Sequence, residues 1–289
     1  MRIIDAQLHE PAVSLGWEGA ERDLRWPVML ELQLGYLRAV GVDAAVLFPS
    51  EFAWGAWAAQ RVPETFTVVG MVGAKWAGGL DPARPDLLDE LEIMAASPGL
   101  VGIRVVRLPA EPLELYDRVF SFAGNAGLPL FLTTAGDFDA PRSVAAAHPE
   151  LAVVLDQLGL HQPPGKPTDP PFRDLPDLLA LAELPNIHLK MTGAPTLSAE
   201  NYPFADLWTS LRPLIDEFGP HRLMWGSDIS RIIGKVGFKQ MFDPERIRAY
   251  HAYHSYAEAL LYVRETDRLS PEEKEWLLHG TAATVLKMT

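Results

Sequence analysis

Hydrophobic and polar residues follow one another along this chain in a repeating pattern of two kinds of segment. Short apolar runs rich in β-branched residues alternate with longer amphipathic stretches, which predicts repeated strand–helix units. Each run is almost continuously apolar, as expected for parallel strands buried on both faces. The predicted strands are Arg2–His9, Val42–Ser50, Thr65–Gly73, Leu100–Leu108, Leu128–Gly136, Leu151–Gly159, Asn186–Gly193 and Arg222–Ser230.

The stretches between the strands have apolar residues at helical spacing. Glycines just before the next strand, such as Gly127, mark helix ends, and Ser270-Pro271-Glu272-Glu273 opens a last helix with an N-cap residue and early acids. Glu51–Arg61 is a short and weak helix candidate between the second and third strands. The other predicted helices are Pro27–Val40, Pro85–Ala96, Leu113–Ala126, Pro141–His148, Asp174–Leu184, Phe204–Phe218 and Pro244–Thr266.

Eight strand–helix units followed by one extra helix predict a single (β/α)₈ TIM barrel that occupies residues 1–289, with an additional C-terminal helix. A doubly wound sheet is the alternative. That fold usually carries a glycine-rich phosphate-binding turn after its first strand, whereas this chain has Glu10-Pro11-Ala12 there. The pattern therefore favours the barrel.

The composition narrows the classes of function. Hydrophobic residues make up 48% of the chain and charged residues 22%, as in an ordinary globular protein. A formal net charge of −13 disfavours nucleic acid as a partner, and the lack of cysteine excludes disulfides and thiolate chemistry. We expect a cytoplasmic protein with no membrane partner, because no apolar run approaches about 20 residues and Asp5 and His9 interrupt the N-terminus where a signal peptide would be apolar.

Candidate catalytic groups stand at the predicted carboxyl ends of the strands, where barrels of this type place their active sites. Asp228 ends the apolar run Leu223-Met224-Trp225, and low-dielectric surroundings make a carboxylate a better general base. His9 could bind a metal, polarise a carbonyl group or orient water, and Gln7 projects to the same side of the strand. Alternatively, Asp228 caps the next loop and His9 is a core histidine.

Basic and aromatic residues near the same strand ends predict substrate contacts. Arg104 and Arg231 could clamp a substrate carboxylate with forked hydrogen bonds, and the charge of Lys190 in an apolar strand requires either a function or an ion-pair partner. Five tryptophans follow the first three strands and either wall an apolar pocket or pack the loops. They are Trp17, Trp26, Trp54, Trp57 and Trp76, of which we favour Trp54 and Trp76 as substrate contacts.

Five motifs and the chain's ending carry a family resemblance. The motifs are Ile3-Ile4-Asp5-Ala6-Gln7-Leu8-His9, Leu100-Val101-Gly102-Ile103-Arg104, Val154-Leu155-Asp156-Gln157-Leu158-Gly159, Asn186-Ile187-His188-Leu189-Lys190-Met191-Thr192-Gly193 and Leu223-Met224-Trp225-Gly226-Ser227-Asp228, with the ending Thr281-Ala282-Ala283-Thr284-Val285-Leu286. In this order they resemble amidohydrolase family 2, in particular the branch of 2-pyrone-4,6-dicarboxylate lactonase and sugar lactonases. The resemblance implies a (β/α)₈ barrel that hydrolyses a C–O or C–N bond, with Asp228 activating water.

The chain departs from the family pattern at its histidines. Gln7 stands where the family usually has the first histidine of the first strand, and Gln157 replaces the histidine of the sixth-strand motif. Thr133 or Thr134 occupies the fifth strand where metal-binding relatives often have another histidine. His9 and Asp228 remain as good ligands, whereas a catalytic zinc typically has three. We therefore expect no metal and no other cofactor, with one divalent ion, most plausibly zinc, as the alternative.

The resulting hypothesis is a hydrolase that opens a lactone or related cyclic ester of a carboxylic acid. Asp228 activates water, while His9, Gln7 and Gln157 stabilise the developing oxyanion. Arg104, Lys190 and Arg231 hold polar groups of this small-molecule substrate. Two rivals stay open: a metal-dependent hydrolase or decarboxylase in which His161 or another residue joins His9 and Asp228, and a non-catalytic binding barrel. The sequence leaves a homo-oligomer open.

Overall fold

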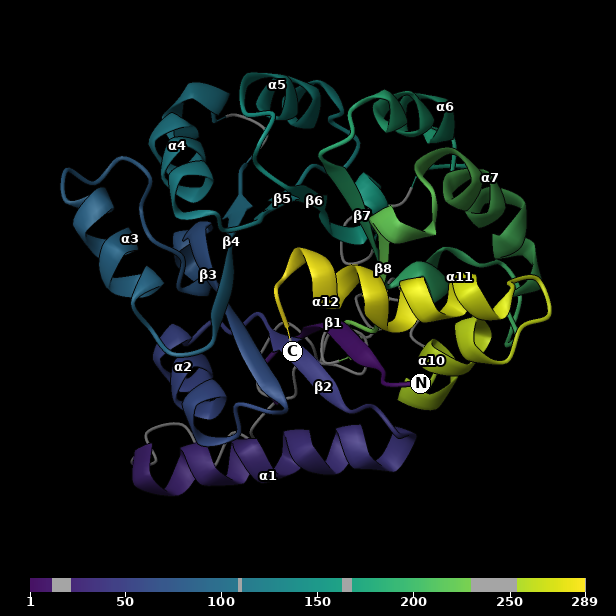
Figure 1. Cartoon of the computed structure of the whole chain (residues 1–289), viewed down its shortest axis with the longest axis horizontal. Coiled ribbons are helices and arrows are strands. Elements are labelled where there is room, and N and C mark those ends of the chain that lie inside the picture. The colour runs from purple at the N-terminus through teal and green to yellow at the C-terminus, as the bar shows by residue number, and fades with distance from the viewer. Residues whose placement is uncertain (12–21, 109–110, 163–167, 230–253, 289) are drawn as a thin grey trace.

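Eight parallel strands stand side by side in chain order and form the wall of a nearly closed barrel (Figure 1). The computed structural model describes residues 1–11, 22–108, 111–162, 168–229 and 254–288. The predicted barrel is confirmed, and each strand is shorter than its apolar run because the ends of the runs enter loops. The strands are β1 (Ile4–Leu8), β2 (Ala44–Leu47), β3 (Phe66–Gly73), β4 (Leu100–Val106), β5 (Leu130–Thr133), β6 (Val153–Leu155), β7 (Ile187–Thr192) and β8 (Leu223–Gly226).

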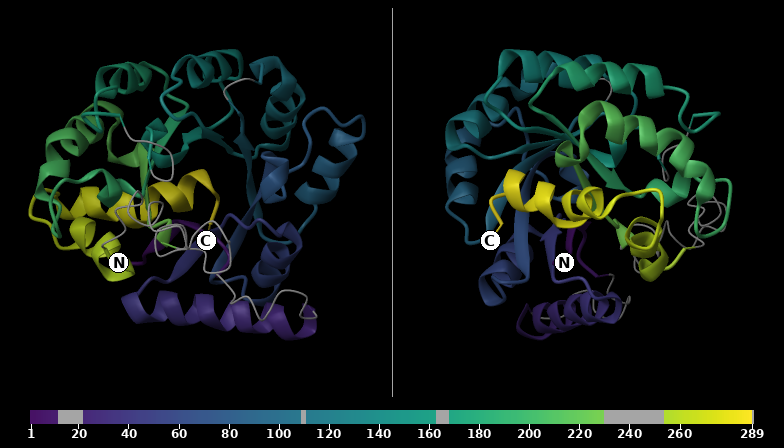
Figure 2. Two further views of the ribbon diagram at one scale, coloured as in Figure 1. Left: turned by 180° about the vertical axis from the view of Figure 1, so that it is seen from behind. Right: turned by 45° about the vertical axis from the view of Figure 1, so that its right-hand side comes forward.

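Helices surround the strands, as the two further views in Figure 2 also show. The α-helices are α1 (Arg22–Val40), α2 (Phe52–Arg61), α3 (Leu87–Ala95), α4 (Asp117–Ala126), α5 (Asp139–Ala147), α6 (Leu175–Leu179), α7 (Trp208–Phe218), α10 (Tyr256–Arg264), α11 (Pro271–Glu275) and α12 (Thr281–Val285). The weak prediction of a helix over Glu51–Arg61 is confirmed by α2. Within the described residues, none of the helices is both long and apolar enough to cross a membrane.

The predicted helices differ from the α-helices of the structure by one to five residues at an end. Helix α1 starts at Arg22, so the expected start at Pro27 is wrong. The extra turn is held by Glu51, which accepts hydrogen bonds from Arg25 Nη2 at 2.6 Å and Trp26 Nε1 at 3.2 Å. Of the predicted helix over 244–266, residues 244–253 lie outside the described residues, and the described part is α10.

The barrel interior has an apolar floor that the C-terminal helix closes. Inward-facing residues of the strands form one hydrophobic cluster with Ala282 and Leu286 of the C-terminal segment. Thr281 Oγ1 donates to the Pro220 carbonyl just before β8, and Lys287 Nζ donates to the Gly127 carbonyl just before β5. These contacts lie at the amino-terminal ends of strands, so α12 covers that end of the barrel and the polar groups described below occupy the opposite end.

Candidate active site

A bulge in β1 turns Gln7 and His9 toward the barrel interior. Ile4 and Ala6 belong to the interior cluster, whereas Leu8 belongs to the outer layer between the barrel and the helices. The pairing register with β2 shifts between Asp5 and Leu8, which accounts for this reversal of the inward side. The side chains of Gln7 and His9 meet, with their Nε2 atoms 3.5 Å apart.

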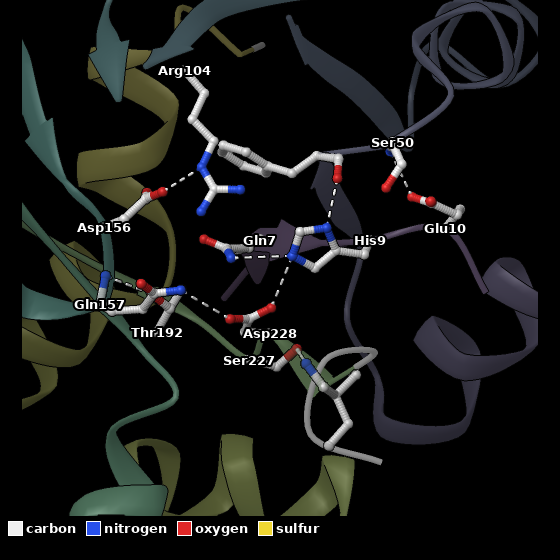
Figure 3. A network of polar contacts seen from close by, with 12 residues as sticks. Gln7, His9, Glu10, Ser50, Arg104, Asp156, Gln157, Thr192, Ser227 and Asp228 are labelled. Carbon is white, nitrogen blue, oxygen red and sulfur yellow. Dashed lines mark hydrogen bonds and ion pairs between the residues drawn. The ribbon is translucent and has the colours of Figure 1, made fainter. Parts of the chain in front are cut away.

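His9 is held on both sides of its imidazole ring. Its Nδ1 lies 2.6 Å from the Phe48 carbonyl oxygen, which can only accept, so Nδ1 carries a hydrogen. The opposite nitrogen, Nε2, lies 3.2 Å from Asp228 Oδ1. Gln33 of α1 donates through Nε2 to the His9 carbonyl at 2.7 Å and fixes the backbone. The ring therefore presents Nε2 to Asp228 in a fixed direction (Figure 3).

Asp228 is the second residue after β8, separated from it by Ser227, and has no exposed surface. Its backbone has a φ of +52°, a left-handed conformation that is unusual for a residue other than glycine. The Asp228 amide donates to the Gln7 carbonyl at 3.0 Å. Gln157 Nε2 donates to Asp228 Oδ2 at 3.5 Å, so the structure brings together all four residues predicted to be catalytic.

Gln157 also has a left-handed backbone, with a φ of +53°. Its backbone amide donates to Thr192 Oγ1 of β7 at 3.0 Å, and its backbone carbonyl accepts from Gln162 Nε2 at 3.1 Å. These two bonds hold the turn after β6 in the conformation that points the Gln157 side chain at Asp228. Non-glycine residues with positive φ cluster at functional sites, where the surroundings enforce them.

A buried charge cluster lies beside these residues. Asp156 Oδ2 accepts from Arg104 Nε at 2.6 Å, and Lys190 Nζ lies 2.6 Å from Asp156 Oδ1. Lys190 has no exposed surface and its Nζ also lies 3.8 Å from the centre of the Phe48 ring and 4.5 Å from that of Phe131. The ion-pair partner anticipated for Lys190 is therefore Asp156.

The surroundings shift the pKa of both ends of this pair. Burial lowers the pKa of Lys190 from its ordinary 10.5 to about 8, although Asp156 opposes the change. Burial works to raise the pKa of Asp156, but Arg104 and Lys190 outweigh it and hold that pKa below its ordinary value. With Arg104 charged, two cations face one anion below about pH 8, and the cluster carries a net positive charge.

Arg104 is the member of this cluster with an exposed side-chain surface, 12%, whereas the side chains of Asp156 and Lys190 have none. Only its Nε is bound to Asp156, and Figure 3 shows its two terminal nitrogens turned away from Asp156 toward Gln7. A guanidinium fixed through Nε presents these two nitrogens as a fork that matches the two oxygens of a carboxylate.

The structure describes the other residues predicted to contact the substrate to different extents. Trp54 lies in α2 without exposed surface, and its Nε1 donates to the Trp26 carbonyl at 3.4 Å, so in this structure its ring packs the helices against the barrel. The backbone of Trp76 lies in a short 3₁₀ turn after β3, and its side chain is outside the described part. Arg231 lies outside the described residues. Their contacts with substrate stay predictions.

The described residues do not fit a conventional zinc site. His9 Nε2 and Asp228 are suitable ligands, but the side-chain amide nitrogens of Gln7 and Gln157, which contact them at 3.5 Å, are hydrogen-bond donors and not metal ligands. Among the described residues, no group of three or more His, Cys, Asp or Glu side chains is arranged to hold a metal ion. A catalytic zinc usually requires three such ligands, so we derive no step through a metal.

Sequence reasoning did not identify Tyr256 or the two aromatic rings around Lys190. Tyr256 OH donates to Asp5 Oδ2 at 2.8 Å across 251 residues of sequence, and Asp5 also binds Ser227. The signal available in the sequence was Asp5 itself, a carboxylate within an otherwise apolar strand that requires partners. Its partners come from other parts of the chain, so spacing alone could not name them.

Comparisons with known proteins agree with this fold. A hydrolase described as 4-sulfomuconolactone hydrolase, from Rhizobium radiobacter, is 27% identical over 154 residues, which are 50% of this chain and 48% of that protein. The chain is therefore matched to about half the length of this curated relative. An amidohydrolase structure from Burkholderia multivorans with bound zinc has a TM-score of 0.73 at 20% identity, and each chain is covered completely.

A second solved structure, described as a 2-pyrone-4,6-dicarboxylic acid hydrolase from Pseudomonas putida, has a TM-score of 0.67 at 22% identity. The match covers 99% of this chain and 98% of that one, and at this identity it supports the fold. The family model described as amidohydrolase matches residues 4–288, nearly the whole sequence. On this match the chain belongs to the amidohydrolase family, as its motifs predicted.

Proposed function

We propose that this protein hydrolyses a lactone or related cyclic ester of a carboxylic acid. The observation that carries the proposal is the fully buried Asp228 carboxylate, which lies 3.2 Å from His9 Nε2 at the catalytic end of a barrel. The relatives that are described as lactone hydrolases support the bond type, and the family supports hydrolysis in general.

Asp228 acts as the general base in this proposal. It takes a proton from water while the water oxygen forms a bond to the lactone carbonyl carbon. The tetrahedral intermediate then collapses, the ring C–O bond breaks, and Asp228 returns the proton to the leaving alkoxide. The products are a carboxylic acid and a hydroxyl group on one opened chain. The acid then loses its proton to solvent, so atoms and protons balance with water as the co-reactant.

Neutral and cationic donors stabilise the negative charge on the carbonyl oxygen. The amide nitrogens of Gln7 and Gln157 lie beside His9 Nε2 and Asp228 Oδ2, respectively, so they are close to the site of attack. His9 donates from Nε2 when its ring is protonated, because its Nδ1 hydrogen is already used by Phe48. Donors fixed by the fold need little reorganisation during the reaction.

The substrate carries a negative charge in this proposal. The fork of Arg104 receives the anionic group, while Lys190 contributes through Asp156 and through the net positive charge of the cluster. Arg231 is proposed as a further substrate contact, with Trp76 proposed for the apolar part of the substrate. The reaction proceeds without a conventional metal cage.

Replacement of Asp228 by Asn tests the base directly. We expect kcat for a carboxylated lactone such as muconolactone to fall by about 10²- to 10⁴-fold, because the amide cannot accept the proton from water. The melting temperature should stay close to that of the wild type, since the side chain keeps its shape. Turnover of D228N at the wild-type rate would remove Asp228 from the base role.

Two further measurements separate the rival functions. A metal-dependent enzyme would contain a stoichiometric divalent ion on purification and would lose activity on chelation and regain it on readdition. A binding barrel would bind the lactone in calorimetry without opening it, even with Asp228 intact. The proposal requires turnover that survives chelation.

A further inference from the structure

The junction between the first and last strands is built differently from the other strand pairs. In the described part of the chain, ladders join β1 to β2 and each following pair up to β7 and β8, which makes seven. At the junction of β8 with β1, the Asp228 amide donates to the Gln7 carbonyl at 3.0 Å. Beside the contact of His9 with Asp228, the described residues add bonds across this junction through the side chain of Asp5.

Asp5 accepts hydrogen bonds from four donors and has no exposed surface. Its Oδ1 accepts from the Gln7 amide at 3.0 Å and the Ser227 amide at 2.8 Å. Its Oδ2 accepts from Ser227 Oγ at 2.5 Å and Tyr256 OH at 2.8 Å. The carboxylate therefore ties together β1, the end of β8 and the start of α10.

Ser227 passes this restraint to both sides of Asp228. Ser227 Oγ donates to Asp5 and also accepts from the Ile229 amide at 3.1 Å, so the residues before and after Asp228 are held by one hydroxyl group. Asp228 between them has the left-handed φ of +52°. Such a conformation costs free energy in a non-glycine residue and persists only where the surroundings enforce it.

We propose that Asp5 is a positioning residue that, through Ser227 and Tyr256, holds the left-handed turn at Asp228 so that its carboxylate faces His9. Asp5 touches neither the substrate nor the reacting atoms. The inference rests on the proposed function, because the direction of the Asp228 carboxylate affects the rate only if Asp228 is the general base. A displacement of the reacting carboxylate by only about 1 Å can lower the rate on the order of 10²-fold.

Only an acceptor with two oxygens satisfies this arrangement, since all four partners donate. Asparagine has the same shape but offers one oxygen and an amino group. In Asp5→Asn the two backbone amides keep their acceptor, while the hydroxyl groups of Ser227 and Tyr256 must turn to accept instead. Ser227 Oγ then loses its fixed direction, and the turn at Asp228 loosens without a change in packing.

The experiment compares D5N, Y256F and the control Y262F with the wild type, using muconolactone as the probe. We expect D5N to lower kcat by about 10- to 100-fold while KM stays within about two-fold. Y256F removes one of the four donors and should lower kcat by about five-fold. Tyr262 is a second buried tyrosine of α10 and is not one of the hydrogen-bond donors to Asp5 described above, so Y262F should keep the wild-type kcat.

Two results would overturn the positioning role. The first is a wild-type kcat in D5N. The second is a loss of kcat in D5N that the control Y262F shows equally. If D5N does not fold, Y256F takes its place in this comparison. Binding of the ring-opened product, measured by calorimetry, should be the same in D5N and the wild type. The proposed function fails separately, if D228N turns over at the wild-type rate.

Discussion

Among the residues that the structure describes, three aspartates are almost completely buried, and the groups that their oxygens face decide their roles. Asp5 faces four hydrogen-bond donors, Asp156 faces two cations, and Asp228 faces His9 and the Gln157 amide. Buried carboxylates require such compensation, because an isolated charge in an apolar medium is costly. Of the three, Asp228 is the one at the carboxyl end of a strand beside a histidine, which suits proton transfer.

Asp5 gives a prediction about stability and pH. Burial raises its pKa from 3.8 to about 6, against the hydrogen bonds from Ser227, Gln7 and Tyr256. The folded state therefore binds more protons between these values, and the contribution of Asp5 to stability, complete below pH 3.8, is lost as the pH rises through 6. The advantage of wild type over D5N should fall by roughly 2 kcal/mol from pH 4 to pH 7.

Chemical denaturation of both proteins at a series of pH values measures this difference. Asp228→Asn is a second reference protein that retains Asp5. The difference in unfolding free energy between D228N and D5N should therefore also fall from pH 4 to pH 7. A difference between wild type and D5N that is constant with pH would show that Asp5 has the same pKa folded and unfolded.

At the scale of elements, small residues decide how closely the last strand approaches the first. A Cβ added to Gly226 at the end of β8 would lie 2.6 Å from Thr192 Cγ2 and 3.1 Å from the Gln7 amide nitrogen. The missing side chain therefore leaves room for β1, and the junction that carries Asp228 depends on it.

Gly226→Ala should destabilise the protein by about 1–3 kcal/mol and lower kcat, because the added methyl group meets Thr192 of β7 and the backbone of β1. Gly35 of α1 is the matched control, since a Cβ there meets nothing within 4 Å. G35A should be stabilising by about 0.5–1 kcal/mol, as alanine favours a helix. Urea denaturation and steady-state kinetics check both variants, and a fully active, stable G226A would contradict the close approach.

At the scale of the whole molecule, the barrel is closed at one end and polar at the other. The floor consists of inward-facing apolar strand residues covered by the C-terminal segment, in which Leu286 is 2% exposed. Stability and chemistry are thereby assigned to opposite ends, as is common in barrels of this fold.

Leu286→Ala should therefore cost about 2–4 kcal/mol of unfolding free energy and leave kcat and KM unchanged. The same substitution at Leu88, an exposed leucine of α3, should have little effect on stability. A fall in kcat of L286A under conditions where it is fully folded would show that the two ends are coupled.

Much of this arrangement was predictable, because the period of two in a strand determines which residues share a face. Arg104 and Lys190 could be placed at the catalytic end from their positions in apolar runs. With strict alternation along β1, Gln7 would lie on the same side of the strand as Asp5, outside the barrel. The bulge that turns Gln7 inward has no signal in the sequence. Partners from distant strands, such as Asp156 for Lys190, depend on the tertiary structure.

The separation in sequence between Asp5 and its hydrogen-bond partners has a consequence for biosynthesis. Asp5 leaves the ribosome 222 residues before Ser227 and 251 residues before Tyr256. Until both have been translated, the nascent polypeptide lacks partners of Asp5, and a chain that stops before Ser227 also lacks the Asp228 base. Under the proposed mechanism such chains are inert toward the substrate, and catalytic competence follows the translation of β8 and α10.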